Sequence, residues 1–260
     1  SGYWAHPIDL SRVRNDYRLV AGNKVTGFTI NGPLKGFPLV VERNGDGWTL
    51  SIDGIARYPA NEAYVAGFIA ELARRRRLVS ASGIGDYRYG TDGDGSCIVM
   101  VHTERGDVTL SFGQSNADER YRYVSLGGET VYRTDNGLAP WLDNRTSRWI
   151  DPYPYRKRIA VTSVQGVTAY GSEGYRAVSD TVAMKAFEYG LANLPCRDIS
   201  NIPPYPDVYL HVECGDASVI RLSFTRLDGG TVLLHEMDSG KSWVTGYSDY
   251  ESLLRTLSER

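Results

Sequence analysis

The feature that most constrains this chain is a short motif that occurs twice. Residues 102–107 read His-Thr-Glu-Arg-Gly-Asp, and residues 211–216 read His-Val-Glu-Cys-Gly-Asp. The tripeptide Leu-Ser-Phe follows each motif, at 110–112 and at 222–224. A pattern that recurs together with its neighbours indicates a repeated structural unit. We therefore predict that two copies of one fold lie in tandem.

The residues around each motif alternate between apolar and polar, as expected for strands that bury one face. Gly-Asp within each motif is a turn signal. Each motif therefore predicts an antiparallel hairpin, and the three extra residues of the second copy fit a longer hairpin loop. The alternating apolar positions that follow the motifs are Val108, Leu110 and Phe112, and Ile220, Leu222 and Phe224.

A helix is predicted upstream of each hairpin. Asn61 in the first copy and Asp180 in the second are suitable N-caps. The apolar residues that follow are three or four positions apart, which is the spacing of one helix face. They are Tyr64, Val65, Phe68, Ile69 and Leu72 in the first copy, and Met184, Phe187, Leu191 and Leu194 in the second.

The predicted fold class is α+β, with two tandem repeats, each a mainly antiparallel sheet with a helix packed on one face. We place the repeats at 20–148 and 157–260, joined by a Pro-rich linker at 151–158. The opening strands also match, Val-Thr-Gly-Phe at 25–28 with Val-Thr-Ser-Val at 161–164.

Charge argues against a nucleic-acid partner. The 260 residues carry a net charge of −2, so no general basic field can hold a phosphate backbone. The arginines at 74–77 form the single dense basic run. They are typical of a helix end, where cations complement the helix dipole; the alternative is a patch for nucleic acid or acidic lipid.

We expect that the natural protein has a membrane anchor or a leader that this chain lacks. No stretch approaches the roughly 20 apolar residues that span a bilayer. The chain begins with Ser1-Gly2 rather than Met, as in a trimmed segment. Cys196 and Cys214 would be able to pair in an extracytoplasmic protein, and otherwise they are buried free thiols.

The sequence contains no motif for catalysis, so we predict that the protein is not an enzyme and needs no cofactor. The nucleophile-elbow, zinc-protease and P-loop patterns are all missing from the sequence. The stretch 91–96 contains Asp92, Asp94 and Gly95 like a calcium loop. However, the twelfth position from Asp92 is Thr103 instead of the bidentate Glu that such a loop needs.

The repeated motif also supplies metal-ligand candidates. His102 with Glu104, and His211 with Glu213, are i, i+2 pairs, which point to the same face of a strand. Imidazole and carboxylate groups are ligands of Zn²⁺-type ions. The alternative is a pair of solvated strand ends that recur because the unit recurs.

Aromatic and basic residues gather near the junction of the repeats. We single out Trp149, Tyr153, Tyr155 and Arg156 as a possible binding surface, since exposed aromatic side chains mark interfaces. The alternative is a linker whose aromatic side chains pack back onto the two cores.

The first repeat resembles a bacterial domain of unknown function. The resemblance rests on Gly-Asp-Gly-Trp-Thr-Leu at 45–50, Tyr-Pro-Ala-Asn at 58–61, Arg-Tyr-Val-Ser-Leu-Gly-Gly at 122–128, Leu-Ala-Pro-Trp-Leu at 138–142 and Trp-Ile-Asp at 149–151. That family occurs in auxiliary proteins of gliding-motility-type ABC transporters and in related membrane-anchored proteins.

The resemblance implies a non-enzymatic accessory role outside the cytoplasm, in an ABC-type export or motility system. It implies membrane anchoring and contacts with a membrane permease or other envelope proteins. Two alternatives stay open. One is a ligand-binding module for a glycan, a peptide or a metal, with a groove between the repeats, and the other is a hydrolase whose carboxylates sequence alone does not identify.

Overall fold

The computed structural model describes residues 13–20, 24–32, 38–52, 57–81, 89–92, 95–115, 118–128, 130–142, 146–172 and 174–258. The chain divides into two compact units between Trp149 and Ile150. Both are rich in antiparallel strands and contain few helices. Each unit is described separately.

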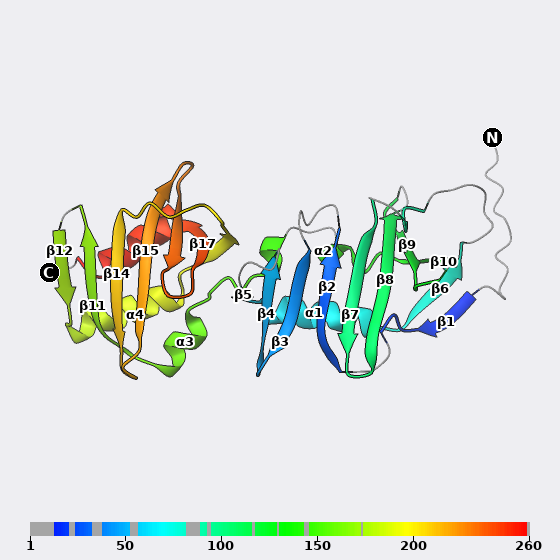
Figure 1. Ribbon diagram of the computed structural model, residues 1–260, viewed down its shortest axis with the longest axis horizontal. Helices are drawn as coiled ribbons and strands as arrows, with labels where there is room; N and C mark the ends of the chain where they lie inside the picture. Colours follow the sequence, from blue (N-terminus) through cyan, green and yellow to red (C-terminus); the bar gives the residue numbers. More distant parts are fainter. Residues whose placement is uncertain are drawn as a thin grey trace. The chain divides into compact units, whose positions relative to one another are not determined.

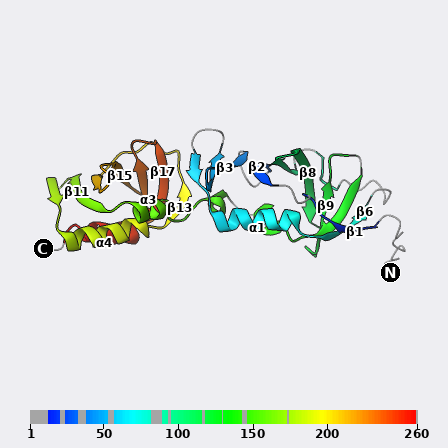
Figure 2. The ribbon, with the colours of Figure 1, turned by 90° about the horizontal axis from the view of Figure 1, so that it is seen from below.

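The first unit is a ten-stranded sheet in the order β1-β6-β10-β9-β8-β7-β2-β3-β4-β5 (Figure 1). Helix α1 (Glu62–Ala73) lies along one face of this sheet (Figure 2), with the short elements α2 (Ala139–Leu142) and η2 (Thr146–Trp149) following the last strand. The strands are β1 (Val13–Tyr17), β2 (Val25–Asn31), β3 (Leu39–Asn44), β4 (Gly47–Ile52), β5 (Arg57–Pro59), β6 (Arg76–Ser80), β7 (Cys97–Thr103), β8 (Gly106–Ser115), β9 (Tyr121–Ser125) and β10 (Val131–Asp135).

The second unit is a seven-stranded sheet in the order β12-β11-β14-β15-β16-β17-β13. Three helices accompany it, α3 (Arg156–Val161), α4 (Thr181–Ala192) and α5 (Tyr247–Arg255). The strands are β11 (Val164–Gly171), β12 (Gly174–Val178), β13 (Cys196–Ile199), β14 (Val208–Cys214), β15 (Val219–Leu227), β16 (Thr231–Glu236) and β17 (Lys241–Gly246).

The two sheets follow the same order over seven strands. Read from β13, the second sheet runs β13-β17-β16-β15-β14-β11-β12, and the first runs β6-β10-β9-β8-β7-β2-β3 over the matching stretch. In both units the long helix stands directly before β6 or β13 in the chain, and a second helix follows β10 or β17. The first unit adds β4 and β5 beyond β3, and β1 beyond β6.

The long helices begin in the same way and bury the same positions. Asn61 accepts a hydrogen bond from the backbone N–H of Tyr64, and Asp180 accepts bonds from Val182 and Ala183. The buried residues are the fourth, seventh and eleventh after each N-cap, a spacing that keeps them on one face. They are Val65, Phe68 and Leu72 in α1, and Met184, Phe187 and Leu191 in α4.

The predicted hairpins exist, but the two matching motifs do not fit one alignment. Leu110 pairs with Val99, and Leu222 pairs with Leu210. If the two leucines are superposed, His102 therefore falls on Glu213 and not on His211. The His-x-Glu motif is displaced by two residues between the hairpins, so the sequence match of the histidines is not a structural match.

The opening strands need a similar correction. A bulge lies between Val25 and Gly27 in β2, and another lies between Val164 and Gly166 in β11. These bulges are in corresponding places, since Gly27 pairs with His102 and Gly166 with Glu213. The counterpart of 25–28 therefore begins at Val164, not at Val161.

In each unit, a described residue of the connection before the central hairpin is hydrogen-bonded to the second strand of that hairpin. Tyr89 carbonyl oxygen accepts a hydrogen bond from the backbone N–H of Gln114, and a Cβ at Gly113 would lie 1.9 Å from that oxygen. In the second unit Thr225 Oγ1 accepts a 3.1 Å bond from the N–H of Tyr205. Gly113 leaves room for Tyr89 in the first unit, and the hydroxyl of Thr225 holds Tyr205 in the second.

The arginine run at 74–77 and the predicted linker at 151–158 contain secondary structure that the sequence did not predict. Arg74 is the C-cap of α1, as the dipole argument predicts, but the side chain of Arg76 is 0% exposed within β6. In the predicted linker, α3 begins at Arg156 and buries Ile159.

Candidate functional site

The residues of the predicted junction surface differ in exposure. Trp149 is 0% exposed and packs against Phe28 and Phe68, with ring centroids 5.4 and 5.3 Å away. Tyr155 is buried beside Trp243 at 5.8 Å. The rings of Trp149 and Tyr155 therefore belong to the cores of the two units.

The other two residues of that predicted surface remain accessible. The guanidinium of Arg156 lies 3.9 Å from the ring centroid of Tyr153, and Arg156 also donates a 3.0 Å hydrogen bond to Asn193. This cation–π pair sits at the start of α3.

The two predicted metal ligands of the first unit have other partners. His102 Nδ1 lies 2.9 Å from Asp107 Oδ1, and Glu104 forms a 3.2 Å ion pair with Lys24. His211 and Glu213 belong to the second unit, on β14. Among the described residues, no group of three or more His, Cys, Asp or Glu side chains is placed to hold a metal.

The structure also gives the positions of the cysteines and of the calcium-like stretch. Cys196 and Cys214 are buried free thiols, so they do not pair with each other, and Cys97 is buried as well. Asp94 of the calcium-like stretch lies outside the described residues, and Asp92 is exposed in a bend before β7.

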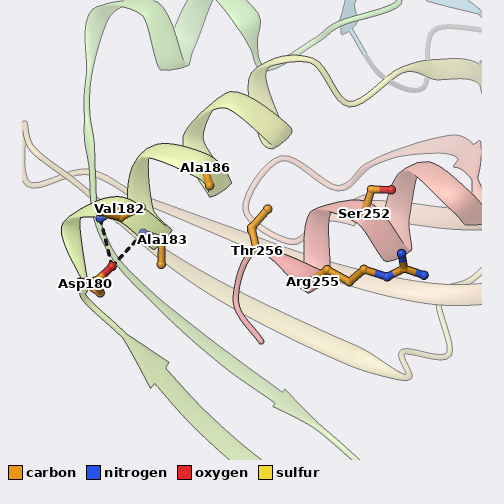
Figure 3. Close-up of a pocket in the computed structure, with 7 residues that line it drawn as sticks. All are labelled: Asp180, Val182, Ala183, Ala186, Ser252, Arg255 and Thr256. Carbon is orange, nitrogen blue, oxygen red and sulfur yellow. Dashed lines mark hydrogen bonds between the residues drawn. The ribbon is translucent and has the colours of Figure 1, made fainter. Parts of the chain in front are cut away.

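A groove lies between α4 and α5 in the second unit (Figure 3). It has a volume of about 520 Å³. Its lining comes from the first two turns of α4 and the last turn of α5. The lining residues are Asp180, Val182, Ala183, Ala186, Ser252, Arg255 and Thr256.

The groove lies where two small side chains of the second unit take the places of two large ones in the first unit. Counting from the N-caps, Ala183 corresponds to Tyr64 and Ala186 to Gly67. Counting from the aligned last strands, Ser252 corresponds to Trp141. In the first unit Trp141 fills this place. Its indole N–H donates a 2.9 Å hydrogen bond to the carbonyl of Tyr64.

The packing around Trp141 shows how closely that place is filled in the first unit. A Cβ at Gly67 would lie 3.0 Å from Trp141 Cζ2, and the rings of Tyr64 and Trp141 are 5.8 Å apart. In the second unit the corresponding Ala183 is half-buried and Ala186 is exposed. An aromatic ring therefore has a place in the first unit and a vacant counterpart in the second.

Charges lie at the two ends of the groove. The Asp180 carboxylate accepts bonds of 3.1 and 3.0 Å from the N–H groups of Val182 and Ala183, drawn in Figure 3. Arg255 pairs with Glu251 at 3.5 Å. The groove therefore combines the apolar side chains of Val182, Ala183 and Ala186 with polar groups at its two ends.

A second surface is a row of tyrosines on the opposite face of the second sheet. Tyr175, Tyr170 and Tyr209 are paired neighbours on β12, β11 and β14. They are 65%, 46% and 40% exposed. Two shallow hollows of about 220 and 470 Å³ are both bordered by Tyr170 and Tyr209, so the rings form a continuous accessible platform.

Polar groups surround this platform. His211 and Arg221 border one hollow, and Asp207 borders the other. Arg221 pairs with Asp238 at 2.7 Å, and Asp207 accepts a 2.7 Å bond from the N–H of Arg226. A flat aromatic surface with hydrogen-bonding groups at its border is suited to polar ligands that carry an apolar face.

Buried polar groups lie in the core of the second unit. Burial, followed by the nearby Glu236, holds the pKa of Tyr155 well above its ordinary value. Burial likewise raises the pKa of Cys196. Glu236 itself is paired with Arg158 at 3.0 Å. These groups are closed off from solvent, which makes them structural.

Sequence reasoning missed both surfaces for a physical reason. The groove depends on the small residues Ala183 and Ser252. Neither carries a signal until it is compared with its counterpart, Tyr64 or Trp141. The tyrosine platform had a signal that was available, because Tyr170 and Tyr209 occupy polar positions of alternating strands.

A known protein family matches this chain. The sequence profile of a family described as a domain of unknown function (DUF4340) matches residues 22–185. The chain therefore belongs to this family of domains of unknown function. The match covers the first unit from β2 onward and reaches the start of α4.

No curated protein and no solved structure matches the chain. No helix among the described residues is both long and apolar enough to cross a membrane.

Proposed function

We propose that this chain is a non-enzymatic interaction domain made of two copies of one α+β unit, in which the second copy binds a partner. The shared strand order and the equal buried positions of α1 and α4 support the duplication. Duplicated units keep their cores and change their surfaces, because core positions are constrained by packing while surface positions are not.

The groove between α4 and α5 is the observation that carries the proposal. Trp141 fills the corresponding place in the first unit, and Ser252 leaves it open in the second. The occupant that fits is a partner segment with a bulky aromatic side chain, and aromatic anchors in pockets dominate many interfaces. The polar rim formed by Asp180 and Arg255 would set its orientation.

The wider setting that we propose is an accessory role in an extracytoplasmic, membrane-anchored part of an ABC-type export or motility system. The partner is then a membrane permease or another envelope protein. The support for this setting is the resemblance of the first unit, and the support for a contact function is the groove.

The experiment places a photo-crosslinking amino acid at Ala186, inside the groove, in cells that produce the natural full-length protein. A second strain carries it at Thr231, a half-buried position in another part of the unit. We expect a crosslink to one envelope membrane protein from position 186 and none to that protein from position 231.

A filled-groove variant provides the matched control. Ser252→Trp restores the residue of the first unit and should remove the crosslink from position 186, while the melting temperature stays at or above that of the parent. A crosslink that survives Ser252→Trp, or a crosslink to cytoplasmic proteins alone, would contradict the proposal.

Glycan binding is a second candidate, and the tyrosine platform favours it. Sugar rings stack their C–H faces on aromatic side chains while their hydroxyls need polar neighbours such as Asp207 and Arg221. Titration with soluble cell-wall oligosaccharides, followed through tyrosine fluorescence, tests it. Binding that Tyr170→Ala removes and Ser252→Trp leaves unchanged supports the glycan candidate, and no saturable change rejects it.

A further inference from the structure

The two edges of the second sheet differ in regularity. The edge strand β13 has a bulge between Cys196 and Asp198, which disturbs further pairing. The opposite edge strand β12 pairs with β11 without any register shift, from Gly174 to Val178. No described strand pairs with the outer side of β12. An even, open edge of this kind can accept another strand.

The first unit has a strand in the corresponding place. β3 is the counterpart of β12 in the strand order, and β4 pairs with its outer side from Leu39↔Ile52 to Asn44↔Gly47. Leu50 of β4 is 1% exposed and lies opposite Val41, so this added strand completes the core. In the second unit the chain passes from β12 through two residues directly into α4.

We propose that β12 binds an extended segment of a partner protein by strand addition, in the place that β4 occupies in the first unit. This surface is separate from the groove between α4 and α5, and the inference does not depend on a partner for that groove. Main-chain hydrogen bonds would supply the affinity, and side chains opposite β12 would supply the selectivity.

The register of the first unit specifies the chemistry of that segment. Val178 corresponds to Val41 and requires an apolar residue opposite, as Leu50 is. Arg176 corresponds to Leu39, whose partner is Ile52. A carboxylate opposite the exposed Arg176 would complement its charge where the first unit uses an apolar pair. The preferred partner segment therefore has an apolar residue, followed by any residue and then by an acidic residue.

The outward-facing backbone groups of β12 can be assigned from the hairpin. Gly171 and Gly174 flank the turn between β11 and β12, so they form its hydrogen-bonded pair. Pairs alternate along an antiparallel ladder, which leaves the N–H groups of Tyr175 and Ala177 pointing away from β11. Ala177→Pro would remove one such donor without removing a bond to β11.

The experiment measures binding of fluorescent synthetic peptides to the intact chain. Each peptide has the β4 sequence Gly-Trp-Thr-Leu-Ser, followed by Glu, Ile or Lys. We expect the Glu peptide to bind about threefold to fivefold more tightly than the Ile peptide, as one cross-strand charge pair allows. Arg176→Glu should reverse the preference to the Lys peptide. Ala177→Pro should remove binding of all three peptides, and Ser252→Trp should leave it unchanged.

Three results would overturn the proposal. One is equal binding of the three peptides to the parent chain, and another is binding that persists in Ala177→Pro. The third is a concentration-dependent dimer in sedimentation that Ala177→Pro dissolves, because β12 would then pair with a second copy. If Ala177→Pro fails to fold by circular dichroism, the charge reversal with Arg176→Glu decides alone, since that residue is exposed.

Discussion

The indole N–H of Trp141 donates a 2.9 Å hydrogen bond to the backbone carbonyl of Tyr64, and this bond fixes the ring against α1. A carbonyl within the first turns of a helix already accepts a bond from within the helix, so the indole adds a second partner to it. Neither Ala183 nor Ser252 can provide such a contact in the second unit, although both occupy the corresponding places.

Trp141→Ala should open in the first unit the groove that the second unit has by nature. The ring is half-buried, so we expect a loss of about 2 kcal/mol in the free energy of unfolding, less than for a fully buried tryptophan. Urea unfolding measures this loss. Ser252→Ala is the matched control and should change stability by less than about 0.5 kcal/mol; an equal effect of the two substitutions would contradict the correspondence.

The serines of the two Leu-Ser-Phe tripeptides should respond differently to alanine. Ser111 Oγ donates a hydrogen bond to the carbonyl of Thr91, whereas the Oγ of Ser223 is buried and has no partner in the described structure. Ser111→Ala should therefore lower the free energy of unfolding by about 1 kcal/mol, and Ser223→Ala should leave it unchanged or raise it. Chemical denaturation of both variants checks this, and the reverse order would show the assignment to be incorrect.

Stability should fall at alkaline pH because of Tyr155 and Cys196. Burial raises the pKa of both groups, so the folded protein retains protons that the unfolded chain releases. Their contribution is complete below the unfolded pKa values of 9.0 for the thiol and 10.0 for the phenol and declines as the pH rises above them. Denaturant unfolding across this range should show the decline.

Tyr155→Phe is the variant that isolates the phenol. It should weaken the alkaline decline above about pH 10 and leave stability near neutral pH equal or higher, because the buried hydroxyl has no hydrogen-bond partner in the described structure. A variant with the same alkaline profile as the parent would assign the decline to other groups.

Glu71 should be essential to the stability of the first unit. Its Oε1 accepts bonds from Arg74 at 2.8 Å and from the buried Arg76 at 3.3 Å. Glu71→Gln leaves a buried guanidinium without its nearest carboxylate, so we expect a loss of about 3 kcal/mol in urea unfolding. The exposed pair Arg255–Glu251 gives the control, since Glu251→Gln should cost about 0.5 kcal/mol or less.

Local signals in the sequence predicted the two long helices and the central hairpins well. Asn61 and Asp180 are caps whose side chains bond to the following backbone, and the apolar spacing after them fixed the buried face. Strand β6 was missed because Arg76 looks like a surface residue, and only its partner Glu71 explains its burial. That pairing depends on tertiary structure, which a charge run does not reveal.

The sequence did not reveal how the strands of the two units align, for a related reason. A match of His102 with His211 is visible in the letters, but strand pairing decides which residues lie at equal height in a sheet. The bulges at Gly27 and Gly166 place His102 level with Glu213. The candidate surfaces needed the same knowledge, since the groove is defined by which residue of one unit corresponds to which residue of the other.

The short passage from Val178 to α4 has a consequence for engineering and for divergence within the family. In the first unit the same passage, from β3 to α1, accommodates β4 and β5, so this junction tolerates an inserted hairpin without loss of the sheet order. A hairpin grafted after Val178 should therefore fold onto the second unit. Relatives that have such a hairpin after β12 would supply the edge strand themselves, and relatives without it would leave the edge open to a partner.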